Sequence, residues 1–272
     1  MSLVFTSLNS GSNGNCYYVA NEEEAILIDA GLSCKETEKR MEKLSLSMRK
    51  IKAIFISHEH IDHIKGAEVL SKKYSIPIYI TNETLKNSRV PIPEININFI
   101  TLQKEIIIGS LHIIAFPKMH DAVEPCSFII KYNNLTVGVF TDIGKVCDNV
   151  IKYFKQCHAA FLEANYDEDM LENGDYPYHL KKRISSDNGH LSNKEAFELF
   201  ENHRPNFMSH LLLSHLSKEN NTPALALEFF YKNNNGVAVS IASRYEATQL
   251  FELKETEIKK AAPIVSMQLT LF

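Results

Sequence analysis

The sequence predicts a mixed α/β (α+β) protein built from two β-sheets with helices packed on their outer faces. Short apolar segments of strand length alternate with segments of helical periodicity along most of the chain. The chain contains no internal repeat, and its 44% hydrophobic and 23% charged residues are ordinary for a globular protein. Its 272 residues are at the upper end of what one large domain holds.

The expected strands are runs of β-branched, aromatic and aliphatic residues bounded by turn-forming residues. They are residues 3–8, 16–20, 25–29, 51–57, 77–81, 98–102, 111–116, 126–132, 136–141, 159–163, 211–214 and 237–242. The expected helices carry apolar residues at helical spacing. They are residues 33–46, 64–73, 144–156, 193–203 and 223–232.

The helix expected at 193–203 has a clear start signal. Ser192 and Glu195 have the spacing of a capping box, in which each side chain accepts a hydrogen bond from a backbone amide at the helix N-terminus. His190 stands just before this N-terminus, where the helix dipole favours an anion.

The folded domain is expected to span residues 1–254, with a linker and tail at 255–272. The segment 254–260 is polar, residues 261–263 are Ala-Ala-Pro, and the last five residues are mainly apolar. A polar linker between a folded domain and an apolar C-terminal peptide is typical of a tail that is not part of the domain.

Composition excludes several classes of protein. No apolar run approaches the roughly 18 residues of a membrane span, and no leader marks the chain for export, so we expect a cytoplasmic protein without a membrane partner. The five cysteines are scattered without a CxxC pair, which favours reduced thiols. With 29 basic and 33 acidic residues the formal net charge is −4, so a polyanion partner would need a local basic patch or bound metal.

The most informative motif is the run His-Glu-His-Ile-Asp-His at 58–63, which follows an expected apolar strand. Residues two apart in an extended segment point the same way, so His58 and His60 can bind one ion. Asp62 and His63 follow where the chain turns into a helix and can face a second ion. Burying three imidazoles and a carboxylate as ordinary core packing is costly, so the run predicts a metal site.

Four residues cannot complete two coordination shells, so further ligands are needed. His120, Asp142 and His215 each follow an apolar strand. Strand ends at one rim of a sheet sandwich are where functional groups collect, because a rigid scaffold holds the loops there.

Together these residues resemble the metallo-β-lactamase fold superfamily over about residues 1–250, with Asp29 in the place of its first motif. The resemblance implies an αββα sandwich of two mixed sheets flanked by helices, and a dinuclear hydrolase with Asp62 and Asp29 among its catalytic residues. It implies one ion held by His58, His60 and His120, another held by Asp62, His63 and His215, and Asp142 bridging them. Zn²⁺ suits these ligands best, and Mn²⁺ or Fe²⁺ also suits a set without thiolate.

Further segments resemble the bacterial YycJ/WalJ-type metallohydrolases. They are residues 7–15, 163–167, 176–183, 189–193 and 214–221. For that family the implied activity is 5′-to-3′ exonuclease action on DNA. The chain would then be a metal-dependent phosphodiesterase of replication or repair, and its interval between Asp142 and His215 is too short for the inserted domain of the β-CASP enzymes.

Two segments are candidates for contact with DNA phosphates. Lys181, Lys182 and Arg183 form a run of three basic residues that could pair with the backbone; a solvated helix face would show the same pattern. The loop at 9–15, with Ser10, Ser12 and Asn13, could offer backbone amides to a phosphate, or it could be an ordinary hairpin turn.

His190 is interpreted as a contact to the transition state or terminal phosphate, and as a candidate proton donor to the leaving oxygen. Ser192 beside it is a candidate substrate contact. Packing of His190 in the core is the alternative.

The last residues, Gln268, Leu269, Leu271 and Phe272, resemble the Gln-Leu-x-Leu-Phe peptide by which bacterial replication and repair proteins dock on the sliding clamp. Leu271 and Phe272 would enter an apolar groove and Gln268 would form hydrogen bonds. Tethering would raise the concentration of the enzyme on DNA. A C-terminal strand on the sheet edge is the alternative.

Two other functions remain open. A small-molecule hydrolase of the same fold would act on a thioester, lactone or cyclic phosphodiester; a deep enclosed pocket would favour it, whereas an open groove reaching 181–183 would favour DNA. A non-catalytic clamp-binding adaptor is the alternative from another class, and the complete set of expected ligands argues against it.

Overall fold

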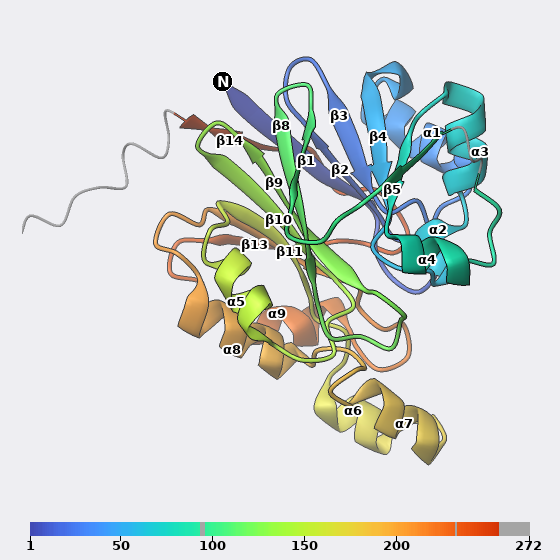
Figure 1. The fold of residues 1–272 in the computed structure, drawn as a ribbon. Coiled ribbons are helices and arrows are strands. Elements are labelled where there is room, and N and C mark those ends of the chain that lie inside the picture. Colours follow the sequence, from blue (N-terminus) through green and yellow to red (C-terminus); the bar gives the residue numbers. More distant parts are fainter. Residues whose placement is uncertain (93–95, 232, 256–272) are drawn as a thin grey trace, which may run out of the picture.

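Two seven-stranded β-sheets lie face to face, and helices cover their outer surfaces (Figure 1). The structure is a computed structural model that describes residues 1–92, 96–231 and 233–255, and these counts refer to that part of the chain. The predicted αββα arrangement of two mixed sheets flanked by helices is confirmed. The tail peptide expected at Gln268, Leu269, Leu271 and Phe272 lies outside the described residues.

The first sheet has the strand order β14-β1-β2-β3-β4-β5-β6. Its strands are β1 (Ser2–Asn9), β2 (Cys16–Ala20), β3 (Ala25–Ile28), β4 (Ile51–Phe55), β5 (Ile78–Ile80), β6 (Ile97–Phe99) and β14 (Phe251–Lys254). Neighbouring strands are antiparallel from β14 to β3 and parallel from β3 to β6. Because β3 and β4 are parallel, the segments that follow them emerge at the same edge.

The second sheet has the order β13-β12-β11-β10-β9-β8-β7. Its strands are β7 (Glu105–Ile108), β8 (Leu111–Pro117), β9 (Cys126–Tyr132), β10 (Leu135–Phe140), β11 (Ala159–Glu163), β12 (His210–Ser214) and β13 (Ala238–Ile241). The strands are antiparallel from β7 to β10 and parallel from β10 to β13. The C-terminal ends of β10, β11 and β12 therefore share one edge, as those of β3 and β4 do in the first sheet.

Aromatic side chains join the two sheets. The rings of Phe5 and Phe161 lie 5.8 Å apart, and those of Phe55 and Phe128 also lie 5.8 Å apart, each pair edge to face across the sandwich. All four side chains are fully buried. Burying a phenylalanine side chain contributes about 1.5–3 kcal/mol, so these contacts hold the two halves of the site at a fixed separation.

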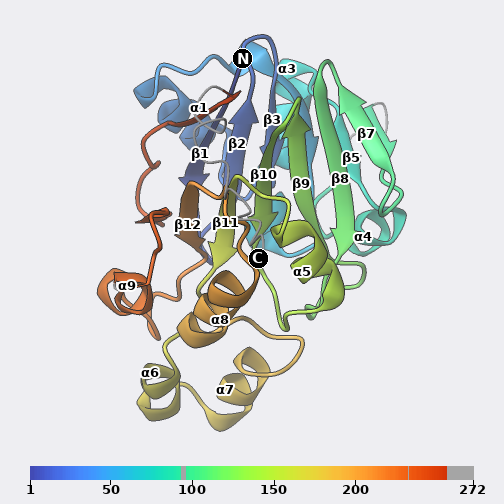
Figure 2. The ribbon, with the colours of Figure 1, turned by 90° about the vertical axis from the view of Figure 1, so that its left-hand side faces the viewer.

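Helices cover the outer faces of both sheets. On the first sheet lie α1 (Cys34–Lys43) and α3 (Ala67–Tyr74), and on the second lie α5 (Asp148–Phe154), α8 (Asn193–His203) and α9 (Pro223–Tyr231). The remaining helices are η1 (Met48–Lys50), α2 (Ile61–Ile64), α4 (Asn82–Asn87), α6 (Glu168–Asn173) and α7 (Tyr178–Ile184). The pair α6 and α7 projects beyond the sandwich (Figure 2).

Some elements differ from the sequence prediction. The helix expected at 64–73 is split into α2 and α3, because the Gly66 amide donates a hydrogen bond to Ala30 O and draws the chain against the first sheet. The helix expected at 144–156 begins only at Asp148, since Gly144 packs against the backbone of residues 187 and 188. The strands β7 and β14 and the short helices α4, α6 and α7 were not predicted. In β14 buried and exposed residues alternate, a signal of period two that marks an edge strand.

All five cysteines are free, and four of them are buried. Among the described residues no helix combines the length and the hydropathy needed to cross a bilayer.

Candidate metal centre

The site forms at the edge of the sandwich where the parallel strands of both sheets end. Asp29 follows β3, and Asp142 and His215 follow β10 and β12. These three residues have positive φ angles of 61°, 55° and 56°. A non-glycine residue in that region costs of order 1–3 kcal/mol, and such strain collects where a side chain must turn sharply into a functional site.

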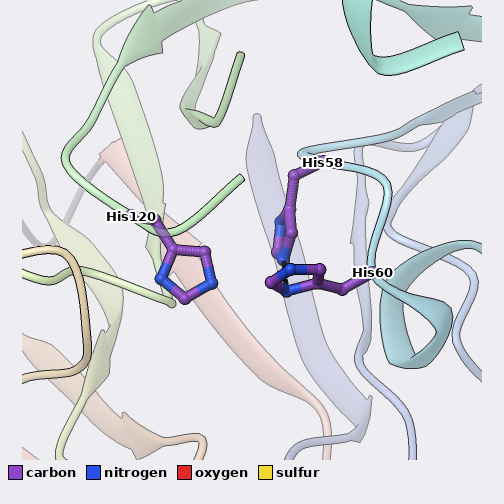
Figure 3. Close-up of side chains that lie close together, drawn as sticks. All are labelled: His58, His60 and His120. Atoms are coloured by element: carbon purple, nitrogen blue, oxygen red, sulfur yellow. Dashed lines mark hydrogen bonds between the residues drawn. The ribbon is translucent and has the colours of Figure 1, made fainter. Parts of the chain in front are cut away.

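The structure brings the seven predicted ligands together. The ring nitrogens of His58, His60 and His120 lie within 4.8 Å of one another, with His120 facing the other two from the opposite side (Figure 3). A second group with the same limit consists of Asp62, His63 and His215. Asp142 lies between them, because it groups with His58 and His63 as well as with His215.

Orphaned polar atoms show that these residues fit a cation. His120 Nε2, Asp142 Oδ2 and His215 Nε2 are buried and have no hydrogen-bond partner. His120 Nδ1 donates to the Gly189 carbonyl at 3.0 Å, which leaves Nε2 as the nitrogen with a lone pair. An unsatisfied buried acceptor costs about 1–3 kcal/mol. Imidazole nitrogen and carboxylate oxygen are donors that Zn²⁺ takes, so bound divalent metal would satisfy all three atoms.

Asp29 orients His63 through a hydrogen bond to Nδ1 of its ring. Its Oδ2 accepts hydrogen bonds from His63 Nδ1 at 2.6 Å and from Ser57 Oγ at 2.9 Å, and its Oδ1 accepts from the Ser57 amide at 2.8 Å. Because Nδ1 of His63 carries the proton, its Nε2 faces the other predicted metal ligands, which we call the ligand cluster. Burial opposes the charge on His63, but the carboxylates of Asp142, Asp29 and Asp62 outweigh it and raise the pKa of this imidazole well above its usual value.

Sequence reasoning assigned no role to Glu163, which organises the other half of the site. This fully buried carboxylate accepts hydrogen bonds at Oε1 from His190 Nδ1 at 2.9 Å and from His215 Nδ1 at 2.8 Å. It also accepts from the backbone amides of Asp142 and Leu191. The available signal was an acidic residue at the end of the apolar run 159–162.

Asn15 is a second residue that the sequence prediction missed. Its Nδ2 lies 3.2 Å from Asp62 Oδ2 and 3.0 Å from His63 Nε2, while its Oδ1 accepts from the Gly11 amide at 2.9 Å and the Tyr17 hydroxyl at 3.2 Å. The two accepted bonds fix the orientation of this buried amide. Asn15 therefore fastens the loop at 9–15 to the predicted ligands.

The ligand cluster lines a cavity of about 390 Å³ that opens to solvent. His190 is part of its wall, with a side chain 20% exposed and a ring centroid 5.2 Å from those of His120 and His215. Ser12 and Arg183 also line the cavity. His190 is thus at the site and not in the core.

The run of three basic residues is divided between two cavities. Arg183 faces the ligand cluster, and its guanidinium pairs with Asp121 at 2.5 Å and 2.6 Å. Lys181 and Lys182 instead line a separate cavity of α6 and α7. There Lys181 Nζ donates to the Glu172 carbonyl at 2.6 Å.

The other predicted substrate contacts lie in different surroundings. Ser10 is buried, and its Oγ accepts a hydrogen bond from the His215 amide at 2.7 Å. Asn13 is exposed and donates to the Arg244 carbonyl at 2.8 Å. Ser192 is buried in the N-terminal cap of α8, where the predicted capping box with Glu195 is confirmed.

Comparisons with known proteins agree with this geometry. Residues 24–215 match the family model described as Beta-lactamase superfamily domain. The chain is 37% identical over 233 residues to exodeoxyribonuclease YycJ of Bacillus anthracis, which covers 83% of this chain and 87% of that protein. It is 34% identical over 227 residues to exodeoxyribonuclease WalJ of Streptococcus pneumoniae, covering 82% and 84%.

Two solved structures share the fold. The metallo-β-lactamase fold protein YhfI from Bacillus subtilis has a TM-score of 0.71 at 18% identity, over 93% of this chain and all of that one. Zn²⁺-bound PqqB from Methylobacterium extorquens has a TM-score of 0.69 at 13% identity, over 92% and 99%. The chain belongs to the metallo-β-lactamase superfamily of metal-dependent hydrolases and, within it, to the family of YycJ and WalJ.

Proposed function

We propose that this protein is a dinuclear metal-dependent phosphodiesterase that degrades DNA in the 5′-to-3′ direction. The observation that carries the proposal is the arrangement of two ligand groups around Asp142 at the base of an open cavity. The name exodeoxyribonuclease, which both YycJ and WalJ carry, supports DNA as the substrate. Such an enzyme would act in replication or repair in the cytoplasm.

Two sets of residues would hold the ions. His58, His60 and His120 would form the first set, and Asp62, His63 and His215 the second. Asp142 would contact both ions, because its Oδ2 lies 3.2 Å from His63 Nε2 and its Oδ1 lies 3.8 Å from His120 Nε2. When bound, such ions supply Lewis acidity and lower the pKa of a coordinated water towards neutrality. Zn²⁺ suits the donors best, and Mn²⁺ or Fe²⁺ is the alternative.

His190 would handle the proton of the leaving group. Glu163 accepts a hydrogen bond from Nδ1 and fixes the ring, so that the opposite edge of the imidazole lines the cavity. When Nε2 also carries a proton, a ring held in this way can donate that proton to the departing oxygen, which contributes typically 10²–10⁴-fold. Arg183 and Ser12 would contact the phosphate from the cavity wall.

The shape of the cavity supports a polymer over a small molecule. It opens to solvent and extends from the ligand cluster to Arg183 and to Tyr176 before α7. Small-ligand sites typically bury most of their substrate, whereas the opening of this cavity leaves room for a strand to pass.

Direction and mode of cleavage test the proposal. A single-stranded oligonucleotide would carry a 5′ phosphate and either a 5′ or a 3′ label, with Mn²⁺ or Zn²⁺ added. The 5′ label should leave at once as a mononucleotide, while the 3′ label should pass through a ladder of shortening products. Covalently closed circular DNA should stay intact. Cutting of the circle, or early release of the 3′ label, would contradict a 5′-to-3′ exonuclease.

We also propose that the tail binds the bacterial sliding clamp through Gln268, Leu269, Leu271 and Phe272. The residue pattern alone supports this. Full-length protein should bind purified clamp, and the double substitution Leu271→Ala, Phe272→Ala should abolish that binding while DNA cleavage without clamp stays at the wild-type rate. Equal binding by both proteins would refute the assignment.

A further inference from the structure

A second cavity adjoins the one that contains the ligand cluster. It has a volume of about 310 Å³ and shares Leu216 and Ser217 with the first cavity. Most of its wall is apolar, and Leu216, Pro223, Ile241, Ala242 and Tyr245 are among the residues that line it. The volume lies at the lower end of the roughly 300–1,000 Å³ that small-ligand sites occupy.

Arg244 stands at the junction of the two cavities. Its Nη2 donates to Ser12 Oγ at 3.0 Å, and its Nη1 donates to the Leu216 carbonyl at 3.4 Å. Ser12 lines the first cavity, whereas Arg244 itself lines the second. The guanidinium therefore reaches from the second cavity to the edge of the metal site.

The charge on Arg244 is not neutralised by a neighbouring carboxylate. Arg183 forms a two-point ion pair with Asp121, but no acidic group of the described residues lies within ion-pair distance of Arg244. A guanidinium without a carboxylate partner keeps its planar fork of donors for a phosphate. Arg244 is thus better placed than Arg183 to bind a phosphate next to the metal site.

The backbone around Arg244 is held in place before any ligand binds. Ser10 N donates to the Ser243 carbonyl at 3.1 Å, and Arg40 Nη2 donates to the Tyr245 carbonyl at 3.0 Å. The side chain of Tyr245 is nevertheless 73% exposed. An exposed ring on a fixed backbone is the kind of platform on which nucleobases stack.

We propose that the second cavity is a nucleoside subsite, in which one base of a single strand stacks against Tyr245 while Arg244 binds the adjoining phosphate. The inference rests on the proposed nuclease function and deepens it. A base can enter such a cavity only after it has left its partner strand, so DNA must be single-stranded at this point.

The polar groups of the cavity indicate little preference among bases. Ser217 Oγ accepts from the Asn220 amide at 3.1 Å, and Ser243 Oγ accepts from the Tyr245 amide at 3.0 Å. The amide of Asn221 is likewise engaged by the Ala164 and Asn165 carbonyls. Lys218 also lines the cavity and pairs with Glu219 at 3.2 Å. With these groups already engaged, stacking and burial would hold the base, and both tolerate any sequence.

A further cavity offers a path for the rest of the DNA strand beyond the subsite. Tyr245 also lines a third cavity, of about 260 Å³, that reaches Lys39 and Lys43 on α1. Glu36 and Glu246 share this cavity, and Glu36 is paired with Arg40 at 2.9 Å. Lys39 lies 3.9 Å from Glu36, so Lys43 is the better placed of the two lysines to follow the phosphates of the DNA that has not yet been degraded.

Two variants test the subsite, each with a matched control. Tyr245→Ala removes the ring, and Tyr231→Ala removes an equally exposed ring (77%) at the far end of α9. Arg244→Gln removes the charge at the subsite. Arg49→Gln removes an exposed charge in η1, which precedes β4, whereas the predicted metal ligands follow β4. Arg244→Lys keeps the charge but not the fork.

The first measurement compares kcat/KM on a single-stranded oligonucleotide with kcat/KM on the same oligonucleotide with abasic residues next to its 5′-terminal nucleotide, which offer no ring to stack. Tyr245→Ala should lower the ratio of the two about tenfold, because one stacked base is lost. Tyr231→Ala should keep the wild-type ratio. A ratio equal to that of the wild type, which includes equal losses on both substrates, would overturn the subsite.

The second measurement follows oligonucleotide affinity against salt concentration. Loss of one phosphate contact in Arg244→Gln should make the slope of log affinity against log salt shallower by about 0.7, and Arg244→Lys and Arg49→Gln should keep it. A wild-type slope in Arg244→Gln would overturn the assignment. Failure of the wild-type enzyme to cleave any DNA while it hydrolyses bis(p-nitrophenyl) phosphate would instead remove the proposed function itself.

Discussion

Glu163 accepts a hydrogen bond from Nδ1 of His215 at 2.8 Å, so the opposite nitrogen of this imidazole, Nε2, points to Asp62 Oδ2 at 3.7 Å. One buried carboxylate thereby sets the tautomer and the direction of a predicted metal ligand. The same oxygen accepts from His190. A single buried carboxylate thus orients both a predicted metal ligand and the imidazole that we propose as the proton donor.

Replacing Glu163 by Gln tests this orienting role. The amide cannot accept all the hydrogen bonds that the carboxylate accepts, so His215 and His190 should lose their fixed orientation. Partners of this kind typically contribute 10–100-fold to metal affinity. We expect Zn²⁺ affinity, measured by competition with a chromogenic chelator, to fall by about that factor, with a native circular dichroism spectrum. Wild-type affinity would show that Glu163 has only a packing role.

Gly31 is predicted to tolerate no side chain. A Cβ atom at this position would lie 1.7 Å from the carbonyl oxygen of Asp62. Gly31→Ala should therefore push the ligand loop outwards and reduce the free energy of unfolding by at least the 1–3 kcal/mol typical of overpacking. Urea unfolding of the metal-free protein measures this change, and an unaltered midpoint would contradict the close approach.

The site could be predicted only where its residues share a segment or a pattern. His58, His60, Asp62 and His63 lie within one motif, and the three remaining ligands follow apolar strands that the sequence marks plainly. Their assignment to two ions remains a prediction.

Residues whose role depends on contact between distant segments were not predictable in the same way. Glu163 and His215 are 52 positions apart, and Arg244 and Ser12 are 232 apart. Lys181 and Arg183 carry the same charge in one short run, but they lie on different sides of α7 and line different cavities. The strands were easier to predict than the helix ends, because tertiary contacts such as that of Gly66 with Ala30 decide where those helices begin.

Thiol reactivity gives a test of the buried core. Burial raises the pKa of Cys34 to about 11, and it raises the pKa values of Cys16, Cys126 and Cys157 further above the usual range for thiols. Because the thiolate is the reactive form, these four should resist iodoacetamide in the native protein. Cys147, which is partly exposed, should be alkylated first. Mass spectrometry after brief labelling would contradict the fold if Cys16 or Cys157 reacted at a similar rate.

Acid should destabilise the metal-free protein through Glu163. Burial alone would raise the pKa of this carboxyl, but His190 and His215 outweigh burial and lower the pKa from 4.5 to about 2. The unfolded state then binds the proton first, so the stabilisation is complete above pH 4.5 and is lost as the pH falls from 4.5 towards 2. Urea midpoints between pH 6 and 3 should fall more steeply for the wild type than for Glu163→Gln. Parallel curves would contradict this role.

The central claim is that two metal ions on one chain cleave DNA. The most direct measurement titrates metal-free protein with Mn²⁺ or Zn²⁺ and follows both bound ions and release of a 5′-terminal nucleotide from labelled single-stranded DNA, with Asp62→Ala as the control. We predict that cleavage saturates at two equivalents per chain and that the control loses at least about 100-fold in rate. Full cleavage at one equivalent, or no cleavage by wild-type protein that carries two ions, would contradict the claim.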